Sequence, residues 1–559
     1  MHKPRVVLAS ALAILLTAAP LAARAASRPG ASTPDFGAFL AGQFAMSQSD
    51  PAAAAPAYLR ALAADPNNPA MVREGFLTCL LAGRPEALRL ARQLPDNALA
   101  QLLLAGQAAH TGHWDQAVQR FGALSGQGFG VLLRPLLLAW AELGDHHPQR
   151  ALATLRPLAT GQNAPGLYAL HAAMIADIAG DKAAAGQFYR IAQAHLGTPS
   201  MTVAQALASW QARQGDKVAA LATLATLART EPAFSIALPA MARDVNARPT
   251  NSAIEGLAQS YVALSVAPDE QESPLLALAM LRLALDVDPG FLAARFQASL
   301  LLADQGHPAQ ALAILGKVDP KDPLAALIGL HVAALKAVLG RNAEAMADLR
   351  GLAAAHPDSP LPEQQLGDML LDQHHDKQAI AAYDAAIARL VPPAPQSWEL
   401  YYSRGIAKDR AGDWPGAEAD FRHALHLSPD QPAVLNYLGY SLADRNQDLP
   451  QAAKMIERAV AARPQEGAII DSLGWVRLRQ GDIAGAVRAL EHAVQLDPAD
   501  PEINMHLGVA YWHDGRKLEA IYQWHRALNF DPSPRVAKEV QALLHKDTLA
   551  SPAAMQVMR

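Results

Sequence analysis

Residues 471–482, "DSLGWVRLRQGD", combine a Leu-Gly pair, an aromatic residue and a Gly-Asp turn. Three other stretches align with this one: "YYSRGIAKDRAGD" at 401–413, "LNYLGYSLADRNQD" at 435–448 and "NMHLGVAYWHDGR" at 504–516. Each aligned stretch holds one reference glycine, and the four glycines are Gly405, Gly439, Gly474 and Gly508, which lie 34, 35 and 34 residues apart. The regular spacing indicates a structural repeat.

Further landmarks follow each reference glycine at nearly constant distances. A small residue comes twelve or thirteen positions later, and a bulky apolar residue four positions after that; the small residues are Ala417, Ala452, Ala486 and Ala520, and the bulky ones Phe421, Ile456, Leu490 and Trp524. A second alanine and a proline complete each period. This order of glycine, alanine, bulky residue and proline over 34 residues is typical of tetratricopeptide repeats.

The spacing has a physical cause. Two antiparallel helices approach closely only where side chains are small, so the glycine of the first helix faces the alanine of the second, and the bulky residue fills the space beside them. Glycine in the turn between the helices tolerates a positive φ, and proline ends the second helix. No single pair buries its apolar face alone, so the pairs must stack on one another.

The sequence therefore predicts an all-α protein, a right-handed α-solenoid of about 13–14 helix pairs. Half of the 559 residues are hydrophobic and alternating β-branched runs are rare, so no strands are expected. The 47 basic and 52 acidic residues leave a net charge of −5 without a basic block, which argues against nucleic-acid binding.

Weaker repeats and breaks suggest a division of the chain. Seven segments are expected, namely a signal peptide at 1–25, an N-terminal repeat segment at 35–232, an irregular region at 233–275, a middle repeat segment at 276–390, a C-terminal repeat block at 398–534, a capping helix at 535–546 and a flexible tail at 547–559. The break before the C-terminal block is "VPPAPQS", residues 391–397.

The first 25 residues have the features of a secretory signal peptide. Lys3 and Arg5 precede an apolar run from Val6 to Leu16, and Ala23-Arg24-Ala25 forms an A-x-A cleavage site. The alternative is an uncleaved membrane anchor, which the cleavage site disfavours. No cysteine lies near this site, so a bacterial lipid anchor is not expected, and the sequence predicts a periplasmic protein.

No catalytic motif is found in the sequence. Zinc-protease, P-loop and nucleophile-elbow patterns are absent, so we expect no enzyme activity and no cofactor. The single cysteine, Cys79, lies in an apolar run and is expected to be buried and inert. Two histidine pairs, at 146–147 and 374–375, fit solvated turns better than a metal site, since no third ligand accompanies either pair.

A row of residues on the first helices is the candidate binding surface. The residue after each reference glycine, with those four earlier and three later, is expected on the concave side of the solenoid. Aromatic side chains there offer rigid contact area to a protein ligand. The predicted groove residues are Tyr402, Asn436, Tyr440, Asp471, Trp475, Met505 and Trp512. Trp475 has an alternative role, which is packing against the first helix of the adjacent repeat.

The segments "VLNYLGYSLADR", "AIIDSLGWVRLRQGD" and "LEHAVQLDPADPEINMHLGVAYWHDGRKLEAIYQWHRAL" resemble the C-terminal region of exported proteobacterial tetratricopeptide-repeat proteins. These include LbcA-type periplasmic adaptors, which bind a carboxyl-terminal processing protease and deliver cell-wall hydrolases to it. The resemblance is close over 398–530. It implies protein partners of those two kinds, but such adaptors are lipoproteins and this sequence lacks the lipidated cysteine.

The leading functional hypothesis is an exported, non-catalytic adaptor or scaffold that binds proteins through its concave groove and delivers substrates to a periplasmic protease. The alternative is a scaffold subunit of an exopolysaccharide secretion or outer-membrane assembly machine. Neither composition nor spacing identifies the partner or the oligomeric state.

Cleavage of the signal peptide is directly testable. The A-x-A site predicts a mature N-terminus at Ala26 and recovery of the protein in the soluble periplasmic fraction. N-terminal sequencing of the protein from fractionated cells measures both. Retention of Met1, or recovery entirely with membranes after a high-salt wash, would contradict this prediction.

Overall fold

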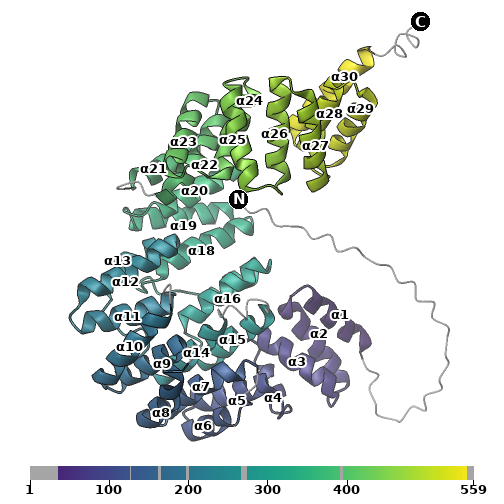
Figure 1. Cartoon of the computed structure of the whole chain (residues 1–559). Helices are drawn as coiled ribbons and strands as arrows, with labels where there is room; N and C mark the ends of the chain where they lie inside the picture. The colour runs from purple at the N-terminus through teal and green to yellow at the C-terminus, as the bar shows by residue number, and fades with distance from the viewer. Residues whose placement is uncertain are drawn as a thin grey trace, which may run out of the picture. The chain divides into compact units, whose positions relative to one another are not determined.

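The computed structural model describes residues 35–125, 128–161, 165–196, 200–265, 274–390 and 395–550, with side chains to residue 545. The predicted signal peptide, residues 391–394 of the predicted break and residues 551–559 of the predicted tail lie outside these ranges. Across the described ranges the chain forms thirty α-helices and two short 3-10 helices, with no strand (Figure 1). The all-α solenoid that the sequence predicts is therefore confirmed.

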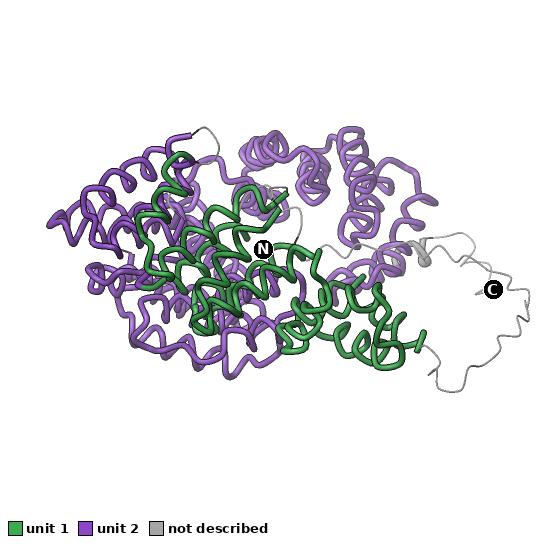
Figure 2. Tube along the Cα trace, turned by 90° about the horizontal axis from the view of Figure 1, so that it is seen from below, with its two compact units in different colours: residues 1–157, 252–294 green, residues 158–251, 295–559 purple. Residues whose placement is uncertain are grey.

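The chain divides into two compact units, and one of them is discontinuous in sequence. Unit 1 comprises residues 1–157 and 252–294, and unit 2 comprises residues 158–251 and 295–559 (Figure 2). The boundaries of the units at 251/252 and 294/295 differ from the segment boundaries expected near 232 and 275. Sequence periodicity reports local helix pairs, whereas the division depends on packing between distant segments.

Unit 1 contains seven consecutive N-terminal helices and two helices from much later in the chain. Its helices are α1 (Phe36–Ser47), α2 (Pro51–Ala64), α3 (Pro69–Leu81), α4 (Glu86–Ala91), α5 (Ala98–His110), α6 (Trp114–Gly122), α7 (Gly130–Gly144), α14 (Ala253–Ser265) and α15 (Pro274–Val287). Two helices, α8 (Pro148–Ala159) and α16 (Leu292–Asp304), cross the boundaries between the units.

Unit 2 contains the remaining helices. In its first part these are α9 (Pro165–Ile178), α10 (Lys182–His195), α11 (Met201–Arg213), α12 (Lys217–Thr230), η1 (Pro232–Ile236) and α13 (Leu238–Arg243). The middle helices are α17 (Pro308–Leu315), α18 (Ala325–Val338), α19 (Asn342–Ala355), α20 (Leu361–Asp372), α21 (Asp376–Ala388) and η3 (Pro395–Ser397). The C-terminal helices are α22 (Trp398–Arg410), α23 (Trp414–Leu427), α24 (Pro432–Asp444), α25 (Leu449–Ala462), α26 (Gly467–Gln480), α27 (Ile483–Leu496), α28 (Pro501–His513), α29 (Lys517–Asn529) and α30 (Pro534–Ala550).

The hairpin of α14 and α15 packs on the first helices of three N-terminal repeats. Helix α14 lies against α7, and α15 lies against α5 and α3. The glycine of α14, Gly256, lets the ring of buried Trp140 approach so closely that a Cβ would meet it at 2.1 Å. On α15, Arg282 Nε donates to the main-chain oxygen of Leu81 at 2.8 Å. In unit 1 the chain therefore covers this helical face with its own later segment.

This packing revises the expectation for residues 233–275. Part of the region is irregular, since it holds the short helices η1 and α13, but α14 is a regular thirteen-residue helix. Residues 266–273 lie outside the described ranges. Helix α14 pairs with its sequence neighbour α15 and also packs against α7, more than a hundred residues earlier, and this second contact has no signal in the tetratricopeptide spacing.

In unit 2 each reference glycine faces the bulky residue of its own repeat. An added Cβ would lie within 2.4–2.7 Å of that side chain in all four C-terminal repeats; the contacts are Gly405 to Phe421, Gly439 to Ile456, Gly474 to Leu490 and Gly508 to Trp524. The four alanines that were predicted to pack there are fully buried, namely Ala417, Ala452, Ala486 and Ala520. Close contact between the two helices thus depends on the absence of a side chain at one position.

The turns between helices use the Gly-Asp pairs. Gly481 has φ +84°, which suits glycine, and Asp482 then accepts a hydrogen bond from Gly485 N at 2.9 Å, which caps α27. Gly412 and Asp413 form the equivalent turn before α23. One residue thus ends the first helix and the next begins the second.

Arginine side chains join neighbouring repeats through main-chain oxygens. Unpaired carbonyl groups at helix ends need hydrogen-bond donors, and the guanidinium group supplies several. Examples are the bonds from Arg410 to Leu371 (3.1 Å), from Arg458 to Pro429 (2.8 Å), from Arg479 to Ala443 (3.2 Å) and from Arg526 to Pro498 (2.9 Å). In unit 1, Arg282 makes the same kind of bond to the end of α3.

Helix α30 covers the last repeat. Val536 and Val540 are buried in a cluster with Trp524, whereas Arg535 and Lys538 are exposed. The helix continues to Ala550, beyond the capping helix expected at 535–546. No helix among the described residues is long and apolar enough to cross a membrane.

The glycine contact predicts a specific loss of stability. In Gly474→Leu the new side chain must displace Leu490, whose Cγ lies 2.4 Å from the position of an added Cβ, so we expect a loss of at least about 1–3 kcal/mol. Gly351→Leu is the matched control, because an added Cβ there meets nothing within 4 Å and the exposed helix gains propensity. Chemical denaturation measures both. Equal stability of the two variants would contradict the proposed register.

Candidate protein-binding face

The first helices of the C-terminal repeats form one continuous face. Contacts across repeats join α20 to α22, α24 to α26, α26 to α28 and α28 to α30. A hydrogen bond from Tyr437 to Asp409 joins α24 to α22, so side chains of successive first helices lie next to one another. We call this surface the first-helix face. It carries the seven residues that the sequence predicted to form a groove.

Trp475 lies half-buried on α26 and contacts the next repeat. Its ring stacks on the imidazole of His506 on α28, with ring centroids 4.2 Å apart and an interplanar angle of 24°. Its indole Nε1 has no hydrogen-bond partner. Trp475 therefore makes the inter-repeat contact that was the alternative to exposure, although the residue is only half-buried.

A buried ion pair lies beneath this stacked ring. His506 Nδ1 lies 2.8 Å from Asp471 Oδ2, and the two residues are 1% and 5% exposed. Burial raises the pKa of the Asp471 carboxyl. Burial alone would lower the pKa of His506, but attraction to the Asp471 carboxylate outweighs it and raises that pKa. The pair joins α26 to α28 at the centre of the face.

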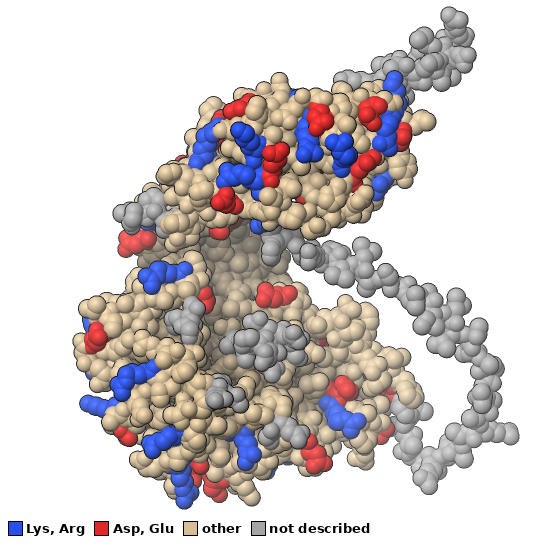
Figure 3. All heavy atoms as spheres, viewed as in Figure 1, with Lys and Arg blue, Asp and Glu red and all other residues tan. Residues whose placement is uncertain are grey.

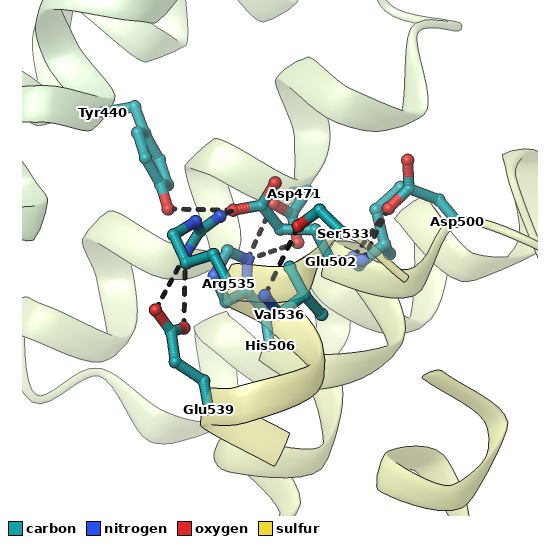
Figure 4. Close-up of polar contacts among 10 residues, drawn as sticks. Tyr440, Asp471, Asp500, Glu502, His506, Ser533, Arg535, Val536 and Glu539 are labelled. Atoms are coloured by element: carbon teal, nitrogen blue, oxygen red, sulfur yellow. Dashed lines mark hydrogen bonds and ion pairs between the residues drawn. The ribbon is translucent and has the colours of Figure 1, made fainter. Parts of the chain in front are cut away.

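A second polar network runs from α24 to α30 (Figure 4). The hydroxyl of Tyr440 donates to Glu502 Oε1 at 3.4 Å, and Arg535 binds the same carboxylate oxygen. Arg535 also pairs with Glu539 at 3.1 Å. Burial, followed by the charge of Glu502, raises the pKa of Tyr440. The network ties the capping helix to two earlier repeats and leaves Tyr440 half-buried.

Aromatic and charged residues meet similarly at the start of the face. The ring of Tyr402 lies 6.1 Å from that of Tyr437, and burial raises the pKa of Tyr402 to about 12. Tyr437 donates to Asp409 Oδ2 at 3.2 Å, and Arg445 pairs with the other oxygen of Asp409 at 2.5 Å. The carboxylate of Asp409 is thus already used within the protein.

The remaining predicted groove residues differ in exposure. Trp512 is half-buried, with its ring centroid 5.5 Å from that of Trp524 and with Lys517 Nζ 5.1 Å from the ring. Asn436 is also half-buried, and its Oδ1 has no hydrogen-bond partner. Met505, by contrast, is 4% exposed and lies in the core under α30.

Met505 and Asp471 therefore require a correction, since neither offers a free surface to a ligand. The prediction used the direction of each side chain around its own helix but not the distance to the neighbouring first helix. Because the first helices contact one another, side chains near the seam between two repeats are buried. Tyr402, Tyr440, Trp475 and Trp512 remain partly accessible on this face.

The sequence reasoning missed His506, Glu502 and Arg535. His506 stands two positions before its reference glycine, as Tyr437 does, and both side chains contact a carboxylate of the preceding repeat. A polar or aromatic residue at this position, with an acid in the preceding first helix, is the signal that could have identified the inter-repeat pairs.

Other chemistry is not gathered near this face. Among the described residues no group of three or more histidine, cysteine or acidic side chains is arranged to hold a metal ion. His146 and His374 have φ of +62° and +59°, as turn residues do. Cys79 is buried, and burial raises the pKa of its thiol to about 11.

Figure 3 shows acidic and basic side chains interspersed over the visible surface of the C-terminal helices.

The buried pair predicts a stability difference that depends on pH. Replacing Asp471 by Asn removes a charged acceptor from His506, and we expect a loss of about 1.5–3 kcal/mol near pH 6. Because the folded-state pKa of His506 is raised above about 6.5, this contribution is full below that pH and is lost as the pH rises through the folded-state pKa. The difference should therefore be smaller at pH 9.

Urea denaturation of both proteins at pH 6 and pH 9 measures this difference. Asp430→Asn is the control, because Asp430 is highly exposed in its pair with Arg458 and should change stability little at either pH. A loss for Asp471→Asn that is the same at pH 6 and pH 9 would show that the pair is not ionised as described.

A family model matches the repeats of the C-terminal block. The tetratricopeptide-repeat family model matches residues 365–432, 402–467 and 472–534. These matches contain all four reference glycines, the first helices α22, α24 and α28, and α26 except for residues 468–471.

Two curated relatives and one solved structure are similar to this chain. A TPR repeat-containing protein of Pseudomonas aeruginosa is 34% identical over 217 residues, which cover 39% of this chain and 36% of that protein. The bacteriophage adsorption protein A of Escherichia coli K12 is 27% identical over 125 residues, covering 21% of this chain and 12% of that protein. The chain thus matches only about a third, or less, of either relative.

The crystal structure of the APC/C hetero-tetramer Cut9–Hcn1 aligns with 90% of this chain and 95% of its own, at 17% identity and a TM-score of 0.37. The family model agrees with the helix pairs seen here, and residues 365–467 and 472–534 match the tetratricopeptide-repeat family.

Proposed function

We propose that this chain is an exported, non-catalytic adaptor that binds proteins through the first-helix face of its C-terminal repeats. Tetratricopeptide repeats support a protein-interaction scaffold. The observation that carries the proposal is a contrast between two first-helix faces. In unit 1 the faces of α3, α5 and α7 are covered by α14 and α15, whereas in the C-terminal block partly accessible aromatic rings extend over four successive repeats.

The accessible rings suit a protein ligand. Tyr402, Tyr440, Trp475 and Trp512 are held in place by neighbouring rings and ion pairs, so a partner would bind them without further loss of side-chain freedom. Aromatic residues of this kind supply most of the binding energy at protein interfaces. The carboxylates nearby are paired internally, so the rings rather than free charges would determine affinity.

The proposed role in delivering substrates to a protease is based on the resemblance to LbcA-type adaptors. We place the chain in the periplasm, where it would bring substrate proteins to a carboxyl-terminal processing protease. Support comes from the signal-peptide features of residues 1–25 and from the similarity of residues 398–530 to those adaptors. Attachment to the membrane through a lipid is not part of the proposal.

The decisive test removes single rings from the first-helix face. Trp512→Ala should lower the capture of periplasmic partners by about thirtyfold, because loss of an aromatic hot spot costs at least about 2 kcal/mol of binding. Tyr522→Ala is the matched control, because Tyr522 is 63% exposed and belongs to the second helix of the same repeat. Affinity capture from periplasmic extracts after chemical cross-linking, with quantitative mass spectrometry, measures both variants.

Melting curves separate binding from packing. Trp512 contacts Trp524, so Trp512→Phe is included as a variant that keeps an aromatic ring at this position. The proposal is supported if Trp512→Phe still captures partners and Trp512→Ala does not, provided that both variants remain folded at the assay temperature. Equal capture by Trp512→Ala and the wild-type protein would overturn the binding face, and capture of polysaccharide-secretion components without a protease would overturn the delivery role.

A further inference from the structure

The N-terminal helix α1 carries an exposed apolar ridge. Phe36, Leu40 and Phe44 are 65%, 61% and 69% exposed, and they stand four residues apart on one side of the helix. No residue from Phe36 to Ser47 is charged. Large exposed apolar side chains are ordinary when scattered, but three in a row on an uncharged helix indicate a contact surface.

Two residues of the ridge, Leu40 and Phe44, occupy positions that are buried or contact the preceding repeat in C-terminal repeats. Gly42 is the counterpart of the reference glycines, because an added Cβ would meet the ring of Tyr58 at 2.8 Å. Phe44 therefore stands two positions after a reference glycine. The equivalent residues of the C-terminal repeats are all buried between repeats, namely Ala407, Ser441, Val476 and Ala510.

Leu40 stands two positions before Gly42, which is the position of His506 relative to Gly508. His506 contacts Asp471 of the preceding repeat. At Leu40 and Phe44 the ridge thus has the positions of a repeat-stacking surface, and in the described part of the chain no repeat precedes it. The counterparts of Phe36, six positions before each reference glycine, are exposed or half-buried, namely Glu399, Ala433, Ala468 and Glu502. The C-terminal end of the solenoid differs, because α30 covers the last repeat there and exposes Arg535, Lys538 and Glu539.

We infer that the ridge of α1 docks against the same ridge of a second copy of this chain. Phe36 and Phe44 stand at equal distances from Leu40, so an antiparallel pair with Leu40 nearest the two-fold axis places each Phe36 opposite the other copy's Phe44. The absence of charge on α1 removes like-charge repulsion from such a pair. Ridges of residues four apart also pack together in the commonest class of helix crossing.

The surface beside the ridge suits this pairing, and the area of the contact determines how strongly the two copies associate. A surface hollow beside the ridge is lined by the apolar side chains of Leu40, Phe44, Met46 and Tyr58 and by the polar side chains of Gln43, Ser47 and Glu74, so a phenyl ring of the second copy would contact its apolar side. Two-thirds-exposed phenyl rings offer roughly 100–150 Å² each, so the ridges together bury well below the ~1,200 Å² of a standard interface. The dimer is therefore a weak, reversible one.

Analytical ultracentrifugation of the full mature chain from about 5 to 500 µM tests the inference, because this range brackets the affinities of small interfaces. Wild type should associate reversibly. Leu40→Asp places two carboxylates at the axis and should weaken association at least about tenfold. Leu40→Lys should do the same, while an equimolar mixture of the two variants should recover association, since opposite charges then meet at the axis.

Leu518→Asp is the matched control, because Leu518 is 81% exposed on α29 and its replacement should leave association unchanged. Circular dichroism of each variant confirms folding, which the exposed positions should not affect. A wild-type chain that stays monomeric throughout, or a mixture that does not recover association, would overturn the two-fold contact. Flotation of the monomer with phosphatidylglycerol vesicles, lost in Leu40→Asp, would assign the ridge to a lipid surface instead.

Discussion

Close approach of two helices at a glycine is the interaction on which the rest of this structure depends. In each C-terminal repeat the space that a glycine leaves empty is filled by one bulky side chain of the second helix, with a buried alanine nearby. A side chain at the glycine position would separate the helices, and the separation would propagate because each of these repeats packs against its neighbours. The rings of the first-helix face keep their positions through this contact.

Polar side chains then fix one repeat against the next. Arginines bind the free carbonyl groups at helix ends, and the pair of His506 and Asp471 joins two first helices inside the stack. A buried ion pair is weak evidence for added stability, but breaking it leaves a buried charge without a partner. These bonds therefore favour one arrangement of the repeats, with Trp475 stacked and Tyr440 held by Glu502.

The sequence predicted the parts of this structure that depend on local spacing. The all-α solenoid and the partners of Gly474 and Gly508 follow from a period of about 34 residues. The return of α14 and α15 to the N-terminal repeats could not be predicted, because the bond from Arg282 to Leu81 joins residues 201 positions apart and has no periodic signal. Burial of Met505 and Asp471 was missed for a related reason, since it depends on the distance between neighbouring first helices.

The proposed function requires that partners bind the first-helix face of the C-terminal repeats. Site-specific photo-cross-linking in living cells tests it even while the partner is unidentified, by placing a photoreactive phenylalanine analogue at Tyr402 or Trp512 on this face and at Tyr522 on the second helix α29. The account predicts cross-linked protein adducts from Tyr402 and Trp512 and none from Tyr522. Adducts from Tyr522 alone would contradict it and would place the binding surface on the second helices.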